Sequence, residues 1–153
     1  MMTAHGLRLW RAFTSLDPEA RGLVVEAAML LGFVSIGLRT MPFGSLRRTL
    51  DRYAARRPRE RRSSRSDVGW AVNAAGRRLP GRTCLIEALA ADVMLRRRGY
   101  EPRLQLGVRK SSDPSRPVDA HAWIECDGEI VVGGLDTLAL YTLQRDADPG
   151  RDR

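Results

Sequence analysis

The spacing of apolar residues changes from a helical period to an alternating period near residue 100. In "CLIEALAADVMLRRRG", residues 84–99, apolar side chains recur on one side of a helix, and Gly99 is a natural helix stop. In "RLQLGVRK", residues 103–110, every second residue is apolar, which is typical of a strand with one buried face. Helical segments before this point and strands after it predict an α+β fold.

Two further strands are expected after this one, "DAHAWIEC" (119–126) and "EIVVGG" (129–134). They are joined by Asp127–Gly128, a dipeptide that favours a two-residue hairpin. Because the loop length sets the register, Cys126 should pair with Glu129.

If no bulge interrupts this register, His121 lies opposite Gly134. Alternation then places on one face His121, Trp123, Glu125, Gly134 and Asp136. Asp136 would be one diagonal step from His121, where its carboxylate could hold the second ring nitrogen.

Three more helices are expected before the helix at 84–99, over residues 15–38, 45–57 and 67–79. Ser15, followed by "LDPEARG", marks the start of the first helix, and Pro42 and Gly44 should end it. The Arg- and Ser-rich segment 57–66 has the composition of an exposed linker. We therefore divide the chain near residue 62. Residues 1–62 form a helical N-terminal region with a basic linker, and residues 63–153 form the α+β domain.

The most apolar stretch of the chain is "LVVEAAMLLGFVSIGL", residues 23–38. It is shorter than the ~20 residues that a membrane-spanning helix needs, and it contains Glu26. We expect a buried helix, or one at a partner or membrane surface, rather than a membrane span.

The formal net charge is +8, and nearly all of the positive charge comes from arginine. Such a charge favours acidic partners: nucleic acid, an anionic membrane surface or an acidic polypeptide. Nucleic acid is not expected, because no aromatic residues interleave the basic run at 57–66. Two cysteines without metal-ligand spacing, and no secretory signal, predict a cytoplasmic protein with free thiols.

Cys84 follows the turn "PGRT" and opens the helix at 84–99. A helix N-terminus stabilises a thiolate and offers backbone N–H donors to an oxyanion, and Arg82 adds positive charge. A thiol there, with His121 from a neighbouring strand as base and Asp136 orienting the ring, could perform acyl transfer or peptide hydrolysis.

Each of these residues also has a structural explanation. Cys84 could be a packing residue, His121 a satisfied half-buried histidine and Asp136 part of a turn. Trp123 is expected in the core. Among the rivals, Cys126 lies beside Asp127, whose negative charge would raise its pKa, and His5 lies near the N-terminus.

The segments "AVNAAGRRLPGRTCLIEALAADVMLRRRGYEPRLQLGV", "AHAWIECDGEIVVGG" and "YTLQ" resemble the B2 proteins of lasso-peptide biosynthesis. These are leader peptidases with a transglutaminase-like, papain-related cysteine protease fold. The likeness is close over residues 68–144, and "LRTMPFGSLRRTL" fits the helical prefix of the same family.

The resemblance implies that Cys84 is the nucleophile and His121 the base, with an acidic residue after the His121 strand as the orienting group. Many relatives carry that acid where this chain has Gly133 or Gly134, so Asp136 is our choice, with Asp127 and Glu125 as alternatives.

The implied reaction is removal of the leader from a lasso precursor peptide delivered by a small leader-recognition protein. A separate cyclase would then close the ring. The implied reaction needs no metal or other cofactor, and the chain has no nucleotide-binding motif.

Three other functions use the same features. A transglutaminase-like acyltransferase would use an amine in place of water. A non-catalytic basic scaffold would bind the leader peptide or nucleic acid through charge alone. A membrane-associated protein would be anchored by residues 23–38.

Overall fold

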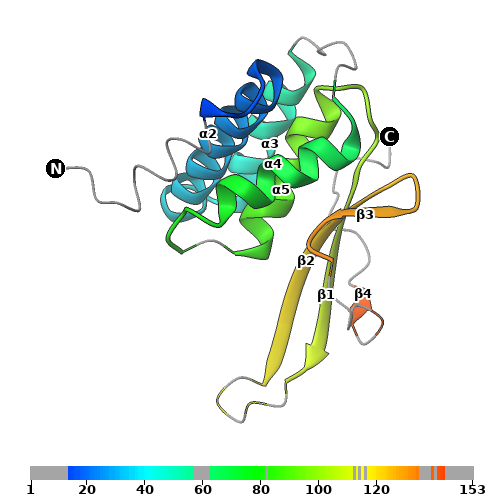
Figure 1. Cartoon of the computed structure of the whole chain (residues 1–153). Coiled ribbons are helices and arrows are strands. Elements are labelled where there is room, and N and C mark those ends of the chain that lie inside the picture. Colours follow the sequence, from blue (N-terminus) through cyan, green and yellow to red (C-terminus); the bar gives the residue numbers. More distant parts are fainter. Residues whose placement is uncertain are drawn as a thin grey trace, which may run out of the picture.

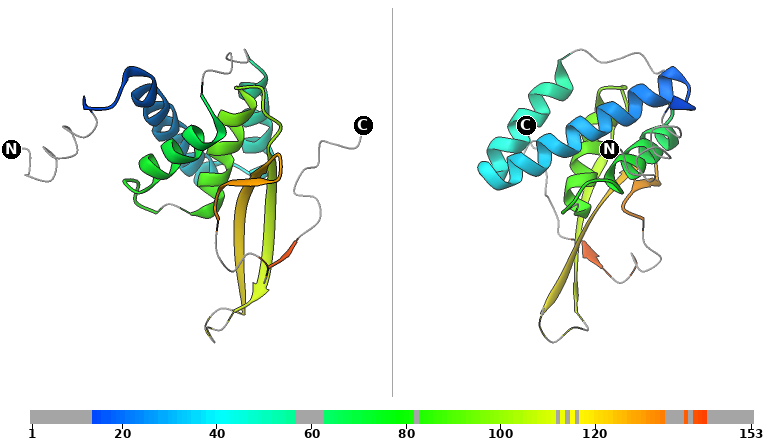
Figure 2. Two further views of the ribbon diagram at one scale, coloured as in Figure 1. Left: turned by 45° about the vertical axis from the view of Figure 1, so that its right-hand side comes forward. Right: turned by 60° about the vertical axis from the view of Figure 1, so that its left-hand side comes forward.

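The computed structural model describes residues 14–56, 63–81, 83–111, 113, 115, 117–134, 139 and 141–143. Within these ranges, four helices cover one side of a small antiparallel sheet, and the β1–β2 hairpin extends beyond the helices (Figures 1 and 2). The helices are α2 (Pro18–Thr40), α3 (Phe43–Ala55), α4 (Arg65–Gly76) and α5 (Cys84–Arg96). The strands are β1 (Arg103–Lys110), β2 (Val118–Cys126), β3 (Glu129–Val132) and β4 (Thr142–Leu143), in the sheet order β3-β2-β1-β4. The predicted α+β class is confirmed.

The two N-terminal helices differ from the prediction at their ends. Asp17 caps α2, because its side chain accepts a hydrogen bond of 2.8 Å from the Ala20 N–H, so the helix begins after Asp17 and not at Ser15. Pro42 follows the end of α2 as predicted, but it is the N-cap of α3. Gly44 was also predicted to end the first helix, and it lies instead inside α3.

The start of α4 lies within the segment that was predicted to be a linker. Ser64 and Asp67 form a capping box, in which each side chain bonds the backbone N–H of the other residue. The predicted domain boundary near residue 62 falls among residues 57–62, outside the described residues. The helices before and after it contribute to one hydrophobic core, since Leu31 of α2, Leu50 of α3 and Leu89 of α5 are all buried in it.

Buried ion pairs join the N-terminal helices to the end of α5. Glu26 of α2, 6% exposed, accepts a hydrogen bond of 2.7 Å from Arg98, which is 4% exposed. Asp92 of α5, 1% exposed, lies 3.1 Å from the guanidinium of Arg47 on α3. Charges this deeply buried are tolerated because each has an opposite charge beside it.

Helix α2 is long and apolar enough to cross a membrane by length and composition alone, with a mean hydropathy of 1.7 over its most apolar window. Its inner face is nevertheless packed in the protein core, where Ala27, Leu31 and Val34 are fully buried. A core helix of a folded domain passes the same test of length and composition.

The β2–β3 hairpin forms at the predicted place. Asp127 and Gly128 both have positive φ, 51° and 80°, and Cys126 pairs with Glu129. A bulge between Ile124 and Glu125 then shifts the register by one residue. The uninterrupted register that was predicted to put His121 opposite Gly134 is therefore wrong.

Candidate active site

Cys84 is the first residue of α5, directly after its N-cap. The N-cap is Thr83, whose side-chain oxygen accepts from the Ile86 N–H at 3.4 Å and whose carbonyl accepts from the Glu87 N–H at 3.2 Å. The N–H groups of Cys84 and Leu85 form no hydrogen bond with the part of the chain that the structure describes. Two backbone donors therefore remain at the end of the helix that carries the half-buried Cys84 thiol.

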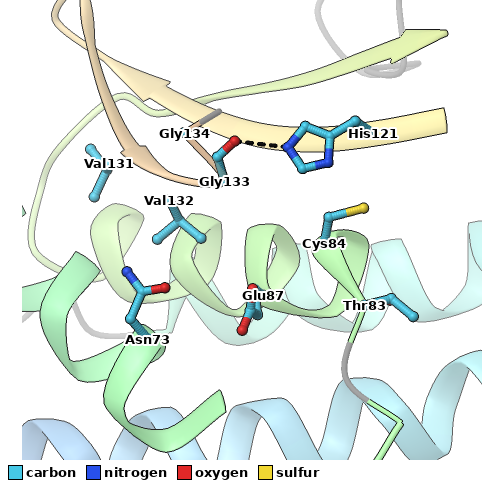
Figure 3. A pocket seen from close by; sticks show the side chains of 9 residues that line it. All are labelled: Asn73, Thr83, Cys84, Glu87, His121, Val131, Val132, Gly133 and Gly134. Carbon is cyan, nitrogen blue, oxygen red and sulfur yellow. Dashed lines mark hydrogen bonds between the residues drawn. The ribbon is translucent and has the colours of Figure 1, made fainter. Parts of the chain in front are cut away.

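His121 extends from β2 toward the N-terminus of α5 (Figure 3). Its Nε2 lies 2.8 Å from the carbonyl oxygen of Gly133. A carbonyl can only accept, so Nε2 carries the hydrogen of the neutral ring and Nδ1 has a free lone pair. Two aromatic side chains lie beside the ring, whose centroid is 6.0 Å from that of Trp123 and 5.7 Å from that of Tyr141.

Gly133 reaches this position because it has no side chain. Its φ is +82°, a left-handed conformation that favours glycine. A Cβ at this residue would lie 2.7 Å from the carbonyl oxygen of Ala122 and 2.9 Å from the Cβ of Trp123. The close approach lets the chain after β3 turn its carbonyl toward His121.

Cys84 and His121 line the same pocket, which has a volume of about 440 Å³. Figure 3 shows the imidazole above the start of α5, beside the thiol. Asn73 of α4 and Glu87 of α5 lie farther along the pocket, whose opposite side is the end of β3. A substrate carbonyl placed here would meet the thiol, the imidazole and the two backbone donors together.

The three acidic residues considered for the orienting role have different positions. Asp136, like Arg82 and His5, lies outside the described residues. Asp127 is in the β2–β3 turn, where its carboxylate accepts from Arg65 at 2.6 Å. Glu125 lines a separate pocket together with Asp127, and neither lines the pocket of Cys84 and His121.

The Gly133 carbonyl is a site group that the sequence did not predict. The register expected from the hairpin paired His121 with Gly134, and the observed register, in which Ile124 pairs with Val132, does not bring Gly133 opposite His121 either. The contact comes from the Gly133 carbonyl to the ring and not from cross-strand pairing. The Gly133–Gly134 pair after β3 was the available signal, because glycine marks places where the backbone approaches another group closely.

Cys126 is the other free cysteine and lies away from the pocket. It is 1% exposed, at the end of β2. Burial raises the pKa of its thiol, and the neighbouring Asp127 carboxylate raises it further, while Arg65 acts in the opposite direction. The predicted direction is confirmed, although burial contributes more than the charge of Asp127.

The pocket thus combines a thiol, an oriented imidazole and backbone donors, which is the equipment for nucleophilic attack on a carbonyl. Within the described ranges, no group of three or more His, Cys, Asp or Glu residues could hold a metal ion. The family model described as "Transglutaminase-like superfamily" matches residues 28–144. No curated protein and no solved structure matches the chain.

Proposed function

The chain belongs to the transglutaminase-like superfamily, and on that premise we propose that it is a cysteine peptidase. Its substrate in this proposal is a ribosomally made lasso precursor peptide, from which it removes the leader. The observation that supports catalysis most directly is the shared pocket of Cys84 and His121, with the His121 tautomer set by the Gly133 carbonyl.

The reaction begins when His121 Nδ1 takes the proton of the Cys84 thiol. The thiolate attacks the carbonyl carbon at the leader–core junction, and the Cys84 N–H with the Leu85 N–H stabilises the oxyanion. His121 then gives its proton to the leaving amine, so the peptide bond breaks and a thioester remains. Finally, His121 takes a proton from water, whose oxygen attacks the thioester and releases the free thiol and a carboxylate.

The Gly133 carbonyl orients the imidazole throughout this cycle. It accepts a hydrogen bond from Nε2 in both the neutral ring and the imidazolium, so it holds the ring without taking its proton. A carboxylate at Asp136 would be an additional charge near the imidazolium, as the resemblance to leader peptidases implies.

The substrate class rests on sequence resemblance rather than on the pocket. The combination of turn, Cys84, helix, "RRRG", strand and "AHAW" is that of the lasso leader peptidases. On this basis the physiological partners are the precursor, a small leader-recognition protein and a separate lasso cyclase. A cytoplasmic location would keep the Cys84 thiol reduced.

Mass spectrometry of a lasso precursor incubated with the chain and its recognition partner tests the proposal. Hydrolysis should give leader and core fragments whose masses sum to the precursor plus one water. Cys84→Ala should abolish cleavage, and His121→Ala should slow it by about 10²–10⁴-fold. Cys126→Ala is the matched control and should retain cleavage.

Two results would contradict the peptidase. An amine adduct in place of the hydrolysed fragment would identify an acyltransferase that uses the same thiol. Precursor binding without cleavage, unchanged in Cys84→Ala and weakened strongly by salt, would identify a basic scaffold.

A further inference from the structure

The outer face of α2 is apolar, although it lies at the surface of the protein. Four large side chains are 43–64% exposed along it: Val25, Met29, Phe33 and Ile36. The inner face of the same helix is packed in the core. A surface helix usually has polar residues on its outer side, and a continuous exposed apolar stripe marks an interaction surface.

Part of this stripe borders a groove between α2 and α3. The groove has a volume of about 280 Å³. Its lining residues, all on these two helices, are Glu26, Met29, Leu30, Phe33, Thr49, Leu50 and Tyr53. A concave apolar groove between two helices can take the side chains of a third helix, whereas a flat bilayer surface would not fill it.

Arginines border the groove on its α3 side. Arg52 follows the lining residue Thr49 by three positions, which places it on the adjoining strip of the α3 surface. Arg56 is the C-cap of α3, three positions after the lining residue Tyr53. Both are exposed, and neither has an ion pair with a described residue.

The acidic groups near the groove are already paired internally. Glu26 is bonded to Arg98 at 2.7 Å, and Asp51 of α3 is bonded to Arg96 at 2.6 Å. The positive charge at the rim is therefore not neutralised by these neighbours, and it complements a negatively charged partner.

We propose that the α2–α3 groove docks an acidic amphipathic helix of a partner protein. Its apolar side chains, spaced i, i+4 and i+7, would lie against Met29 and Phe33, and its glutamates would pair with Arg52 and Arg56. A second copy of this chain is a poorer occupant, since its matching face carries the same arginines and a symmetric contact would bring like charges together.

This surface is separate from the pocket of Cys84. Glu26, at the groove, is paired with Arg98 beyond the C-terminal end of α5, whereas Cys84 begins that helix. The 13 residues of α5 span about 20 Å. The docking proposal does not depend on the proposed peptidase activity, and its test uses binding alone.

The test is fluorescence anisotropy with the full chain and two labelled peptides. The first is an amphipathic helix of about 18 residues, long enough to form in isolation, with Leu and Phe on one face and Glu on both flanks. The second has Lys in place of each Glu. The intact chain should bind the Glu peptide at least tenfold more tightly than the Lys peptide.

The variants then separate charge from apolar contact. Arg52→Glu with Arg56→Glu should reverse the preference in favour of the Lys peptide, and Phe33→Ser should weaken binding of the Glu peptide at least tenfold. Arg77→Glu, an exposed arginine at the C-cap of α4 and outside the groove, is the matched control and should leave the preference unchanged. Circular dichroism of each variant checks that the helices are intact.

Equal binding of the two peptides, or no binding of either, would overturn the proposal. Binding to vesicles of anionic phospholipid that is lost in Phe33→Ser, with no peptide preference, would instead assign the surface to a membrane. Self-association of the intact chain that is abolished in Phe33→Ser would assign it to a second copy.

Discussion

Neutralising Glu26 should destabilise the protein strongly, because this carboxylate balances buried positive charge. Its Oε2 lies 2.7 Å from Arg98 Nη2 and its Oε1 lies 3.7 Å from Arg97 Nε. The side chains of Glu26, Arg97 and Arg98 are 8%, 10% and 4% exposed. Removing one member of such a buried pair leaves an uncompensated charge and typically costs about 3–5 kcal/mol.

Glu26→Gln is the most informative substitution, because it removes the charge and keeps the shape. A loss of about 3–5 kcal/mol is a large part of the free energy of unfolding, which is about 5–15 kcal/mol for an ordinary domain. With a urea dependence of about 2 kcal/mol per molar, the unfolding midpoint should fall by roughly 2 M. Urea titration followed by circular dichroism measures this shift.

Two comparisons decide whether the buried charge is the cause. Glu19→Gln removes an exposed carboxylate from the first turn of the same helix and should cost no more than about 1 kcal/mol. Glu26→Leu combined with Arg98→Met replaces the pair by apolar groups and should recover more than half of the loss. A Glu26→Gln midpoint within the range of Glu19→Gln would refute the reasoning.

Three further predictions concern the site and the α4 cap. Alkylation of the folded protein at pH 8 should modify Cys84 and leave Cys126 unmodified, because Cys126 is buried and its pKa is raised. Intact mass should show one added alkyl group on the wild-type protein and none on the Cys84→Ala variant. Gly133→Ala should slow precursor cleavage at least tenfold, since a Cβ there would meet the Ala122 carbonyl and displace the oxygen that orients the imidazole; normal kinetics would contradict that role. Hydrogen bonds from Ser64, its capping partner, lower the pKa of Asp67. The wild-type protein should therefore be more stable than Asp67→Asn at pH 7, and this difference should decline as the pH falls below about 4. Urea titrations of both proteins at pH 7 and below pH 4 measure the difference.

The sequence was sufficient to predict the structure wherever that structure depends on residues adjacent in the chain. The alternating run at 103–110 is strand β1 with those bounds, and the Asp127–Gly128 turn has the two positive φ values that its composition favours. Gly99, with φ +76°, follows α5 as the predicted helix stop. The position of Cys84 at the start of a helix could also be predicted, because the period of apolar residues, the turn residues and the helix caps are local properties of the chain.

The tertiary structure decided what joins distant parts of the chain. Glu26 was visible in the sequence only as an acid in an apolar helix, and its pairing with Arg98 crosses 72 residues. The bulge between Ile124 and Glu125 was not predicted, and neither was the hydrogen bond from His121 Nε2 to the Gly133 carbonyl. Such contacts are selected by the packing of whole elements against one another, which local patterns do not encode. The sequence by itself therefore determined the fold class, most of the elements and the candidate nucleophile and base, and only the folded chain determined what orients that base.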